Sequence, residues 1–163
     1  MKYLIKVLCL STLVFTWACN SPEPVAEAVV DVPVDMSEST TAVVNHHLEA
    51  FGSNNMEELM ADYTDESVLM TPDGNFTGLA EIQGLFEQVV PMFPVEGTEF
   101  VMDKMVVDNN MAFVVWHAVT PVVEAELATD TFIIKDGKIF RQTFAGLIKP
   151  IDEDEEDDEK EDG

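Results

Sequence analysis

Four stretches in the second half of the chain decide the fold: TEFVMDKMVV (98–107), MAFVVWHAVT (111–120), VVEAELATDTFII (122–134) and KIFRQTFAGLI (138–148). Each alternates apolar and polar residues or runs through β-branched and aromatic ones, which is typical of strands. The breaks between them are Asn109-Asn110, Pro121 and Asp136-Gly137. Connections this short join antiparallel neighbours, so the sequence predicts a four-stranded meander.

Helical patterns come before these strands. Apolar residues recur at three and four positions after Thr40 or Thr41, which can cap a first helix that Gly52 ends. Asn55 caps a short second helix, and Thr77 opens a third with one broad apolar face.

A short apolar run over residues 67–71 separates the second and third helices and ends at Pro72 and the Asp73-Gly74 turn, which predicts a strand and a tight turn. Helices followed by strands indicate the α+β class. We expect three N-terminal helices packed on the concave face of a curved antiparallel sheet, as a cone that encloses a pocket in a domain over residues 40–149.

Charge and composition restrict the partners. The net charge of −24 repels phosphate backbones, which argues against a nucleic-acid partner, while 47% hydrophobic residues indicate a folded core. Between Asp152 and Asp162 only Lys160 is not acidic. Such a block repels itself, so residues 150–163 are expected to be a disordered acidic tail. Residues 20–39 contain three prolines and no helical stripe and are expected to be a disordered tether.

The amino end carries the features of a secretory signal. Lys2 and Lys6 precede an apolar run that is too short to span a bilayer and that stops at Ala18-Cys19. This resembles a bacterial lipoprotein signal over residues 1–19, which implies that Cys19 carries acyl chains such as palmitate and anchors the protein in the cell envelope. An ordinary cleaved signal that leaves Cys19 as a spare thiol is the alternative. Cys9 is the only other cysteine.

The order of elements, with four groups of residues, resembles the NTF2-like superfamily, which includes ketosteroid isomerase, scytalone dehydratase and the SnoaL-like polyketide cyclases. The four groups are Ala61-Asp62-Tyr63-Thr64-Asp65-Glu66-Ser67-Val68, Pro72-Asp73-Gly74 with Phe76-Thr77-Gly78, Thr129-Asp130-Thr131-Phe132, and Asp136-Gly137-Lys138-Ile139. The resemblance covers about residues 41–148. This fold hosts many reactions as well as domains with no chemistry, so it does not identify a reaction.

Alignment with ketosteroid isomerase implies roles for three positions. The tyrosine that donates to the oxyanion falls on His47, the aspartate general base on Thr71, and the protonated aspartate of the oxyanion hole on Asp130. A threonine hydroxyl cannot take a proton from carbon near neutral pH, so ketosteroid isomerase activity is expected to be absent.

Asp130 and His47 remain as a candidate acid/base pair. His47 shares helical spacing with inward apolar residues, and Asp130 shares strand parity with Phe132. Both can equally be hydrogen-bonded core groups, and Asp130 can point to solvent. The other candidate pocket residues are Tyr63, Thr71, Trp116, His117, Phe132 and Gln142.

The sequence predicts no metal site and no cofactor. The adjacent rings of His46 and His47 point about 100° apart on a helix and do not easily share a metal, and no phosphate-binding loop is present. Three functions stay open: a membrane-anchored domain that binds a small apolar or amphipathic molecule without a complete catalytic set, an isomerase, dehydratase or cyclase using Asp130 and His47, and an interaction module that forms a homodimer through the sheet.

Overall fold

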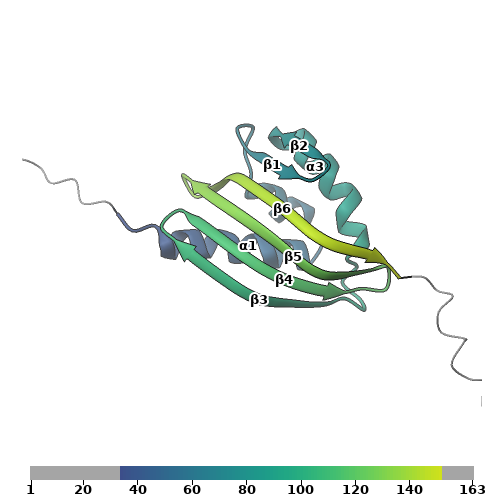
Figure 1. The fold of residues 1–163 in the computed structure, drawn as a ribbon. Coiled ribbons are helices and arrows are strands. Elements are labelled where there is room, and N and C mark those ends of the chain that lie inside the picture. Colours follow the sequence, from purple (N-terminus) through teal and green to yellow (C-terminus); the bar gives the residue numbers. More distant parts are fainter. Residues whose placement is uncertain (1–33, 152–163) are drawn as a thin grey trace, which may run out of the picture. The chain divides into compact units, whose positions relative to one another are not determined.

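A computed structural model describes residues 34–151, which fold into helices and one curved sheet (Figure 1). The predicted signal lies outside these residues, as do most of the tether and most of the acidic tail. Residues 37–39 of the predicted tether belong instead to the first helix, and Pro150 of the predicted tail ends the last strand. The elements in chain order are α1 (Ser37–Gly52), α2 (Met56–Ala61), β1 (Val68–Thr71), β2 (Gly74–Thr77), α3 (Gly78–Val89), a 3-10 turn (Val90–Met92), β3 (Glu99–Asp108), β4 (Met111–Val119), β5 (Val123–Lys135) and β6 (Lys138–Pro150). The α+β class and the curved sheet are confirmed.

The sheet has six strands in the order β2-β1-β6-β5-β4-β3. The four long strands form the predicted antiparallel meander. β1, however, pairs with β6 in parallel, so the expectation of a wholly antiparallel sheet is wrong. The chain between β1 and β6 runs through β2, α3 and the other three strands of the meander rather than through a hairpin, and such a long connection permits either direction.

The helices do not form one N-terminal block, because the β1–β2 hairpin lies between α2 and α3. Strand β2 was not predicted. Its four residues are few, and its last residue, Thr77, which pairs with Val68, is also the N-cap of α3, so Thr77 opens the third helix as predicted. A 3-10 turn follows α3, so the prediction of three helices is also incomplete.

Helix α1 begins at Ser37, three residues earlier than the first predicted cap. The Asp35 carboxylate before the helix accepts a hydrogen bond from the Ser37 amide at 2.9 Å, which satisfies one of the free N–H groups of the first turn. Thr40 is a buried residue inside the helix, and its hydroxyl donates to the Asn109 carbonyl at 2.8 Å. Asn55 caps α2 as predicted by accepting from the Glu58 amide.

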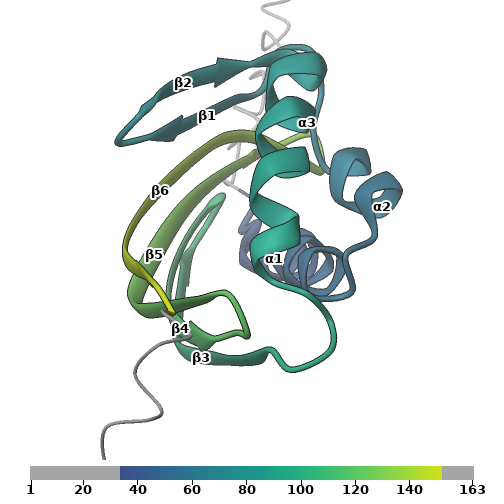
Figure 2. The same cartoon turned by 90° about the vertical axis from the view of Figure 1, so that its right-hand side faces the viewer.

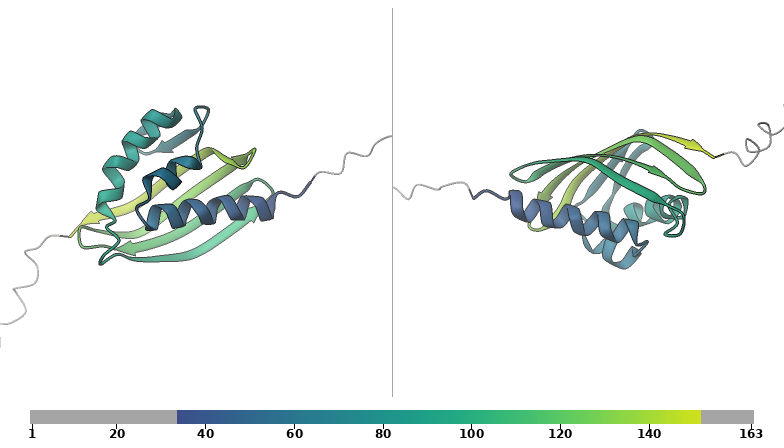
Figure 3. Two further views of the ribbon diagram at one scale, coloured as in Figure 1. Left: turned by 180° about the vertical axis from the view of Figure 1, so that it is seen from behind. Right: turned by 90° about the horizontal axis from the view of Figure 1, so that it is seen from below.

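Figure 2 shows the sheet curving around α1 and α3, and Figure 3 shows α1 lying along its concave side. Alternate residues of β4 and β5 face this side and are buried, among them Val114, Trp116, Asp130 and Phe132. The two-residue period of a strand therefore places these side chains in the cone, and their sequence neighbours on the outer face.

Candidate functional site

A cavity of about 150 Å³ lies between the concave face of the sheet and helices α1 and α3. Its lining is mainly apolar and contains six phenylalanines: Phe51, Phe86, Phe93, Phe100, Phe132 and Phe144. The polar or ionisable lining residues are His47, Thr71, Asp73, Trp116, Asp130 and Gln142. An apolar hollow with a few convergent polar groups is the usual form of a small-molecule site.

Four buried polar residues, here called the interior cluster, meet at one part of this cone: Tyr63, Trp116, Asp130 and Gln142. The Trp116 indole N–H donates to Asp130 Oδ2 at 2.9 Å, and the Gln142 amide donates to Asp130 Oδ1 at 2.8 Å. The Tyr63 hydroxyl donates to Gln142 Oε1. All three hydrogen bonds of the interior cluster are therefore donated in the direction of the Asp130 carboxylate.

Strand register brings the interior cluster together. Trp116 on β4 lies opposite Ala128, two residues before Asp130, and Gln142 on β6 lies opposite Phe132, two residues after it. Both are diagonal neighbours of Asp130 on the same face of the sheet, within reach of long side chains.

Burial raises the pKa of Asp130 to about 6, while the hydrogen bonds from Trp116 and Gln142 act in the opposite direction. A carboxyl with that pKa is about nine-tenths ionised at pH 7. The cavity therefore contains a largely charged carboxylate whose hydrogen-bond donors are both neutral groups.

His47 points from α1 into the cone, where its ring centroid lies 5.3 Å from that of Phe132 and 5.6 Å from that of Tyr63. Burial, with a smaller contribution from His46, lowers the pKa of His47 to about 3, so the ring is neutral at pH 7. Its Nδ1 is buried without a hydrogen-bond partner. Asp62 Oδ2, 3.8 Å away, is too distant for a hydrogen bond.

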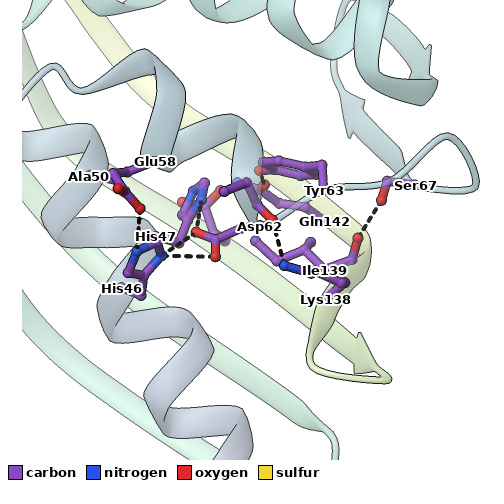
Figure 4. Close-up of polar contacts among 12 residues, drawn as sticks. His46, His47, Ala50, Glu58, Asp62, Tyr63, Ser67, Lys138, Ile139 and Gln142 are labelled. Atoms are coloured by element: carbon purple, nitrogen blue, oxygen red, sulfur yellow. Dashed lines mark hydrogen bonds and ion pairs between the residues drawn. The ribbon is translucent and has the colours of Figure 1, made fainter.

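The preceding residue, His46, belongs to a second group, here called the surface cluster: His46, Glu58 and Asp62 (Figure 4). His46 Nδ1 lies 2.9 Å from Asp62 Oδ1, and Nε2 lies 3.2 Å from Glu58 Oε2. The hydrogen bond to Asp62 is the largest of the effects that raise the pKa of His46. Burial raises the pKa of Asp62.

The structure brings together most, but not all, of the residues that the sequence singled out. His47, Thr71, Trp116, Asp130, Phe132 and Gln142 line the cavity. Tyr63 is absent from the lining but contacts it, through the hydrogen bond to Gln142 and through the rings of His47 and Phe86. His117 lies on the outer face of β4, where its Nδ1 is 2.8 Å from Asp103 Oδ2, so the expectation that it faces the pocket is corrected. The reason is that His117 directly follows Trp116 on β4, and successive side chains of a strand point to opposite faces of the sheet.

Sequence reasoning missed two features of the site. Asp73, taken only as a turn residue, lines the cavity beside Thr71, whose Oγ1 accepts a hydrogen bond from the Asp73 amide. The convergence of six phenylalanines was also missed, because they come from helices, a loop and several strands. Of the six, the sequence had placed only Phe132 in the pocket, and the inward position of Phe51 and Phe86 on their helices was a further available signal.

Within residues 34–151, no group of three or more His, Cys, Asp or Glu side chains is arranged to hold a metal ion. Over the same residues, no helix is both long and apolar enough to cross a membrane.

Comparison with known proteins identifies both a family and a fold. The family model described as the SnoaL-like domain matches residues 44–142. A search of curated protein sequences found no match.

Among solved structures, an NTF2-like protein of unknown function from Mesorhizobium loti superimposes with a TM-score of 0.59 at 19% identity, covering 71% of this chain and 97% of that one. A candidate ketosteroid isomerase from Kribbella flavida gives 0.58 at 16% identity, covering 81% of its length and 69% of this chain. TerC, co-crystallised with polyporic acid, gives 0.55 at 12% identity, with 92% of its length and 67% of this chain covered. At identities this low, the comparisons show a shared fold alone.

Proposed function

Because the chain belongs to the SnoaL-like domain family of the NTF2-like superfamily, we propose that its cone binds a small apolar or amphipathic molecule without a complete catalytic set. One observation carries this proposal: an aromatic-lined cavity of about 150 Å³ that contains a single buried cluster of polar groups. The apolar walls favour the body of the ligand, and the cluster offers a fixed polar contact. TerC, which is similar in fold at 12% identity, was co-crystallised with polyporic acid.

The absence of a base at position 71 supports binding over catalysis. Thr71 lines the cavity where the resemblance to ketosteroid isomerase implies a carboxylate. Its hydroxyl oxygen accepts a hydrogen bond from the Asp73 amide and is a poor proton acceptor near neutral pH.

Titration with 2-naphthol, a fused aromatic with one hydroxyl, tests this proposal. We expect saturable binding of one molecule per chain by calorimetry. Val89→Phe, which enlarges a lining residue of α3, should weaken binding at least about tenfold by filling the cavity. Val119→Phe is the matched control, because Val119 is 45% exposed on β4 and lines no part of the cavity. Absence of saturable binding to the wild type, or equal loss in both variants, would refute the proposal.

An enzyme of the isomerase, dehydratase or cyclase type is the second candidate. The observation that favours it is that Asp130, with a pKa of about 6, and His47 line the same cavity. Such a carboxylate is suited to proton transfer near neutral pH. Deuterium exchange from solvent into the α-position of 2-indanone is the assay: exchange above the solution rate that Asp130→Asn abolishes supports catalysis, and no exchange counts against it.

A homodimer through the sheet is the third candidate. The outer face exposes Val101, Val106, Phe113, Leu127, Ile133 and Leu147. A face this apolar is typical of interaction surfaces. Sedimentation velocity should detect a dimer that Phe113→Glu dissociates, whereas a monomeric wild type would count against this role.

We also propose that acyl chains on Cys19 hold the domain at a bacterial membrane, in the cell envelope. Cys19 lies outside the described residues, and the proposal rests on the sequence pattern alone. Cys19→Ser should move the protein to the soluble fraction and abolish incorporation of labelled palmitate, because the acidic chain has no other membrane affinity. A wild type that carries no lipid would exclude the anchor.

A further inference from the structure

The charges around the cavity are unbalanced. Two carboxylates line it, those of Asp73 and Asp130, and no lysine or arginine does. The five bases of the described domain lie elsewhere: Lys104, Lys135, Lys138 and Lys149 are exposed, and half-buried Arg141 donates to the carbonyls of Glu66 and Phe140. The lining also contains His47, whose ring is neutral at pH 7.

Asp130 is 5% exposed and has no cationic partner among the residues that contact it. Buried carboxylates are normally paired with a positive group, because an unpaired charge away from water is costly. Trp116 and Gln142 each occupy one lone pair of Asp130, and each carboxylate oxygen can accept again. A positive group supplied from outside the chain would complete the pairing.

The walls of the cavity provide a second attraction for a positive group. Six phenyl rings and the Trp116 indole surround the space, with Trp116 and Phe100 stacked at 4.9 Å between centroids. Aromatic faces attract cations, and a ring of them around a desolvated space is how quaternary ammonium groups are bound. The chain as a whole carries −24, which raises the local concentration of cations.

We propose that the ligand of this cavity is an apolar organic cation, with an ammonium group near Asp130 and an aromatic or alkyl body among the phenyl rings. This inference rests on the proposed binding function and names its ligand class. An anionic ligand is disfavoured, because it would face two carboxylates while the Trp116 and Gln142 donors are already used by Asp130. A neutral ligand would leave the carboxylate unpaired.

The test compares phenyltrimethylammonium with tert-butylbenzene, two molecules of the same shape that differ in charge. Calorimetric titration of the full chain at pH 7.5 should give at least about tenfold tighter binding of the cation. In Asp130→Asn, the affinity for phenyltrimethylammonium should fall to the affinity for tert-butylbenzene. The affinity for tert-butylbenzene itself should stay within about twofold of the wild-type value, which also shows that the variant is folded. Asp103→Asn removes the same charge from the outer face and should leave both affinities unchanged.

Acidification offers a second readout. Affinity for phenyltrimethylammonium should fall between pH 7.5 and pH 5, as Asp130 gains a proton with its pKa of about 6, and this fall should be lost in Asp130→Asn. The other titratable groups that face Asp130 are His47 and Tyr63, both of which stay neutral across this range, and Asp73 adds a second carboxylate to the lining.

Each pattern of results decides between the proposals. If both probes bind the wild type equally, the cavity binds apolar ligands and the cation inference is wrong. If neither probe binds, both this inference and the proposed function fail. An equal loss of cation affinity in Asp103→Asn and Asp130→Asn would show that net charge, rather than the cavity, attracts the cation, and this would also overturn the inference.

Discussion

His46 and His47 are consecutive residues of α1, yet they occupy two different electrostatic regions. His46 lies between Glu58 and Asp62 with 44% of its side chain exposed, and the hydrogen bond to Asp62 raises its pKa. His47 is 3% exposed among aromatic rings, and burial lowers its pKa to about 3. A rotation of about 100° between helical neighbours separates a ring that gains a proton easily from one that resists it.

Acidic neighbours alone therefore do not set the charge of a histidine. Asp62 lies within 3.8 Å of both rings. It makes a hydrogen bond only to His46, whose other nitrogen contacts Glu58 near solvent, whereas His47 Nδ1 has no partner. Desolvation is therefore the main influence on the pKa of His47, whereas hydrogen bonding exceeds desolvation at His46.

The largest expected effect is the pH dependence of stability that His47 causes. Between its folded pKa of about 3 and the ordinary value of 6.5, the unfolded chain binds a proton that the folded chain does not, so acid favours unfolding. Between pH 7 and pH 4, the wild type should lose about 3 kcal/mol of unfolding free energy relative to His47→Leu. Urea unfolding at several pH values measures this difference.

His46→Leu is the matched control and should behave in the opposite way. The folded pKa of His46 is raised, so its stabilising contribution is complete below the unfolded pKa and is lost as the pH rises through the folded pKa. Because the His46 side chain is exposed to solvent, its effect on the unfolding free energy should be small. If the unfolding free energies of the wild type and His47→Leu changed with pH in the same way, the proposed difference between the two histidines would be wrong.

Gln142→Ala tests the interior cluster and should have the next largest effect. The change removes the acceptor of the Tyr63 hydroxyl and one donor to Asp130, and both groups stay buried. We expect a loss of about 2–3 kcal/mol in unfolding free energy at pH 7, measured by urea unfolding. The neighbouring change Thr143→Ala, on the exposed face of β6, should alter it by less than about 0.5 kcal/mol. Similar losses in both variants would contradict this interpretation.

The smallest effect is expected from Glu58→Gln in the surface cluster. Glu58 is 55% exposed, so its loss should change the unfolding free energy by less than about 0.5 kcal/mol. The pKa of His46, followed by NMR of its ring protons, should fall, and Asp62→Asn should lower it further, because the hydrogen bond to Asp62 is the larger cause. The reverse order would show that Glu58 dominates the cluster.

Local sequence patterns predicted the elements well. Asn55 caps α2, the turns at Asn109-Asn110 and Asp136-Gly137 separate long strands, and the helices lie where apolar residues recur at three and four positions. Patterns also placed two site residues, since His47 shares the inward stripe of α1 and Asp130 the inward parity of Phe132. These properties depend on the periods of helix and strand, which any short stretch of sequence contains.

The sequence alone predicts a cone of helices on a curved sheet, the family resemblance that goes with it, and the inward direction of His47, whereas for Asp130 an orientation toward solvent stayed open. The tertiary structure adds that β1 joins β6 in parallel, that Trp116 and Gln142 both donate to Asp130, and that no lysine or arginine of the described residues lines the cavity. The physical reason is that strand register and sheet curvature bring together residues far apart in the chain, and a local period does not encode which distant partner each side chain meets.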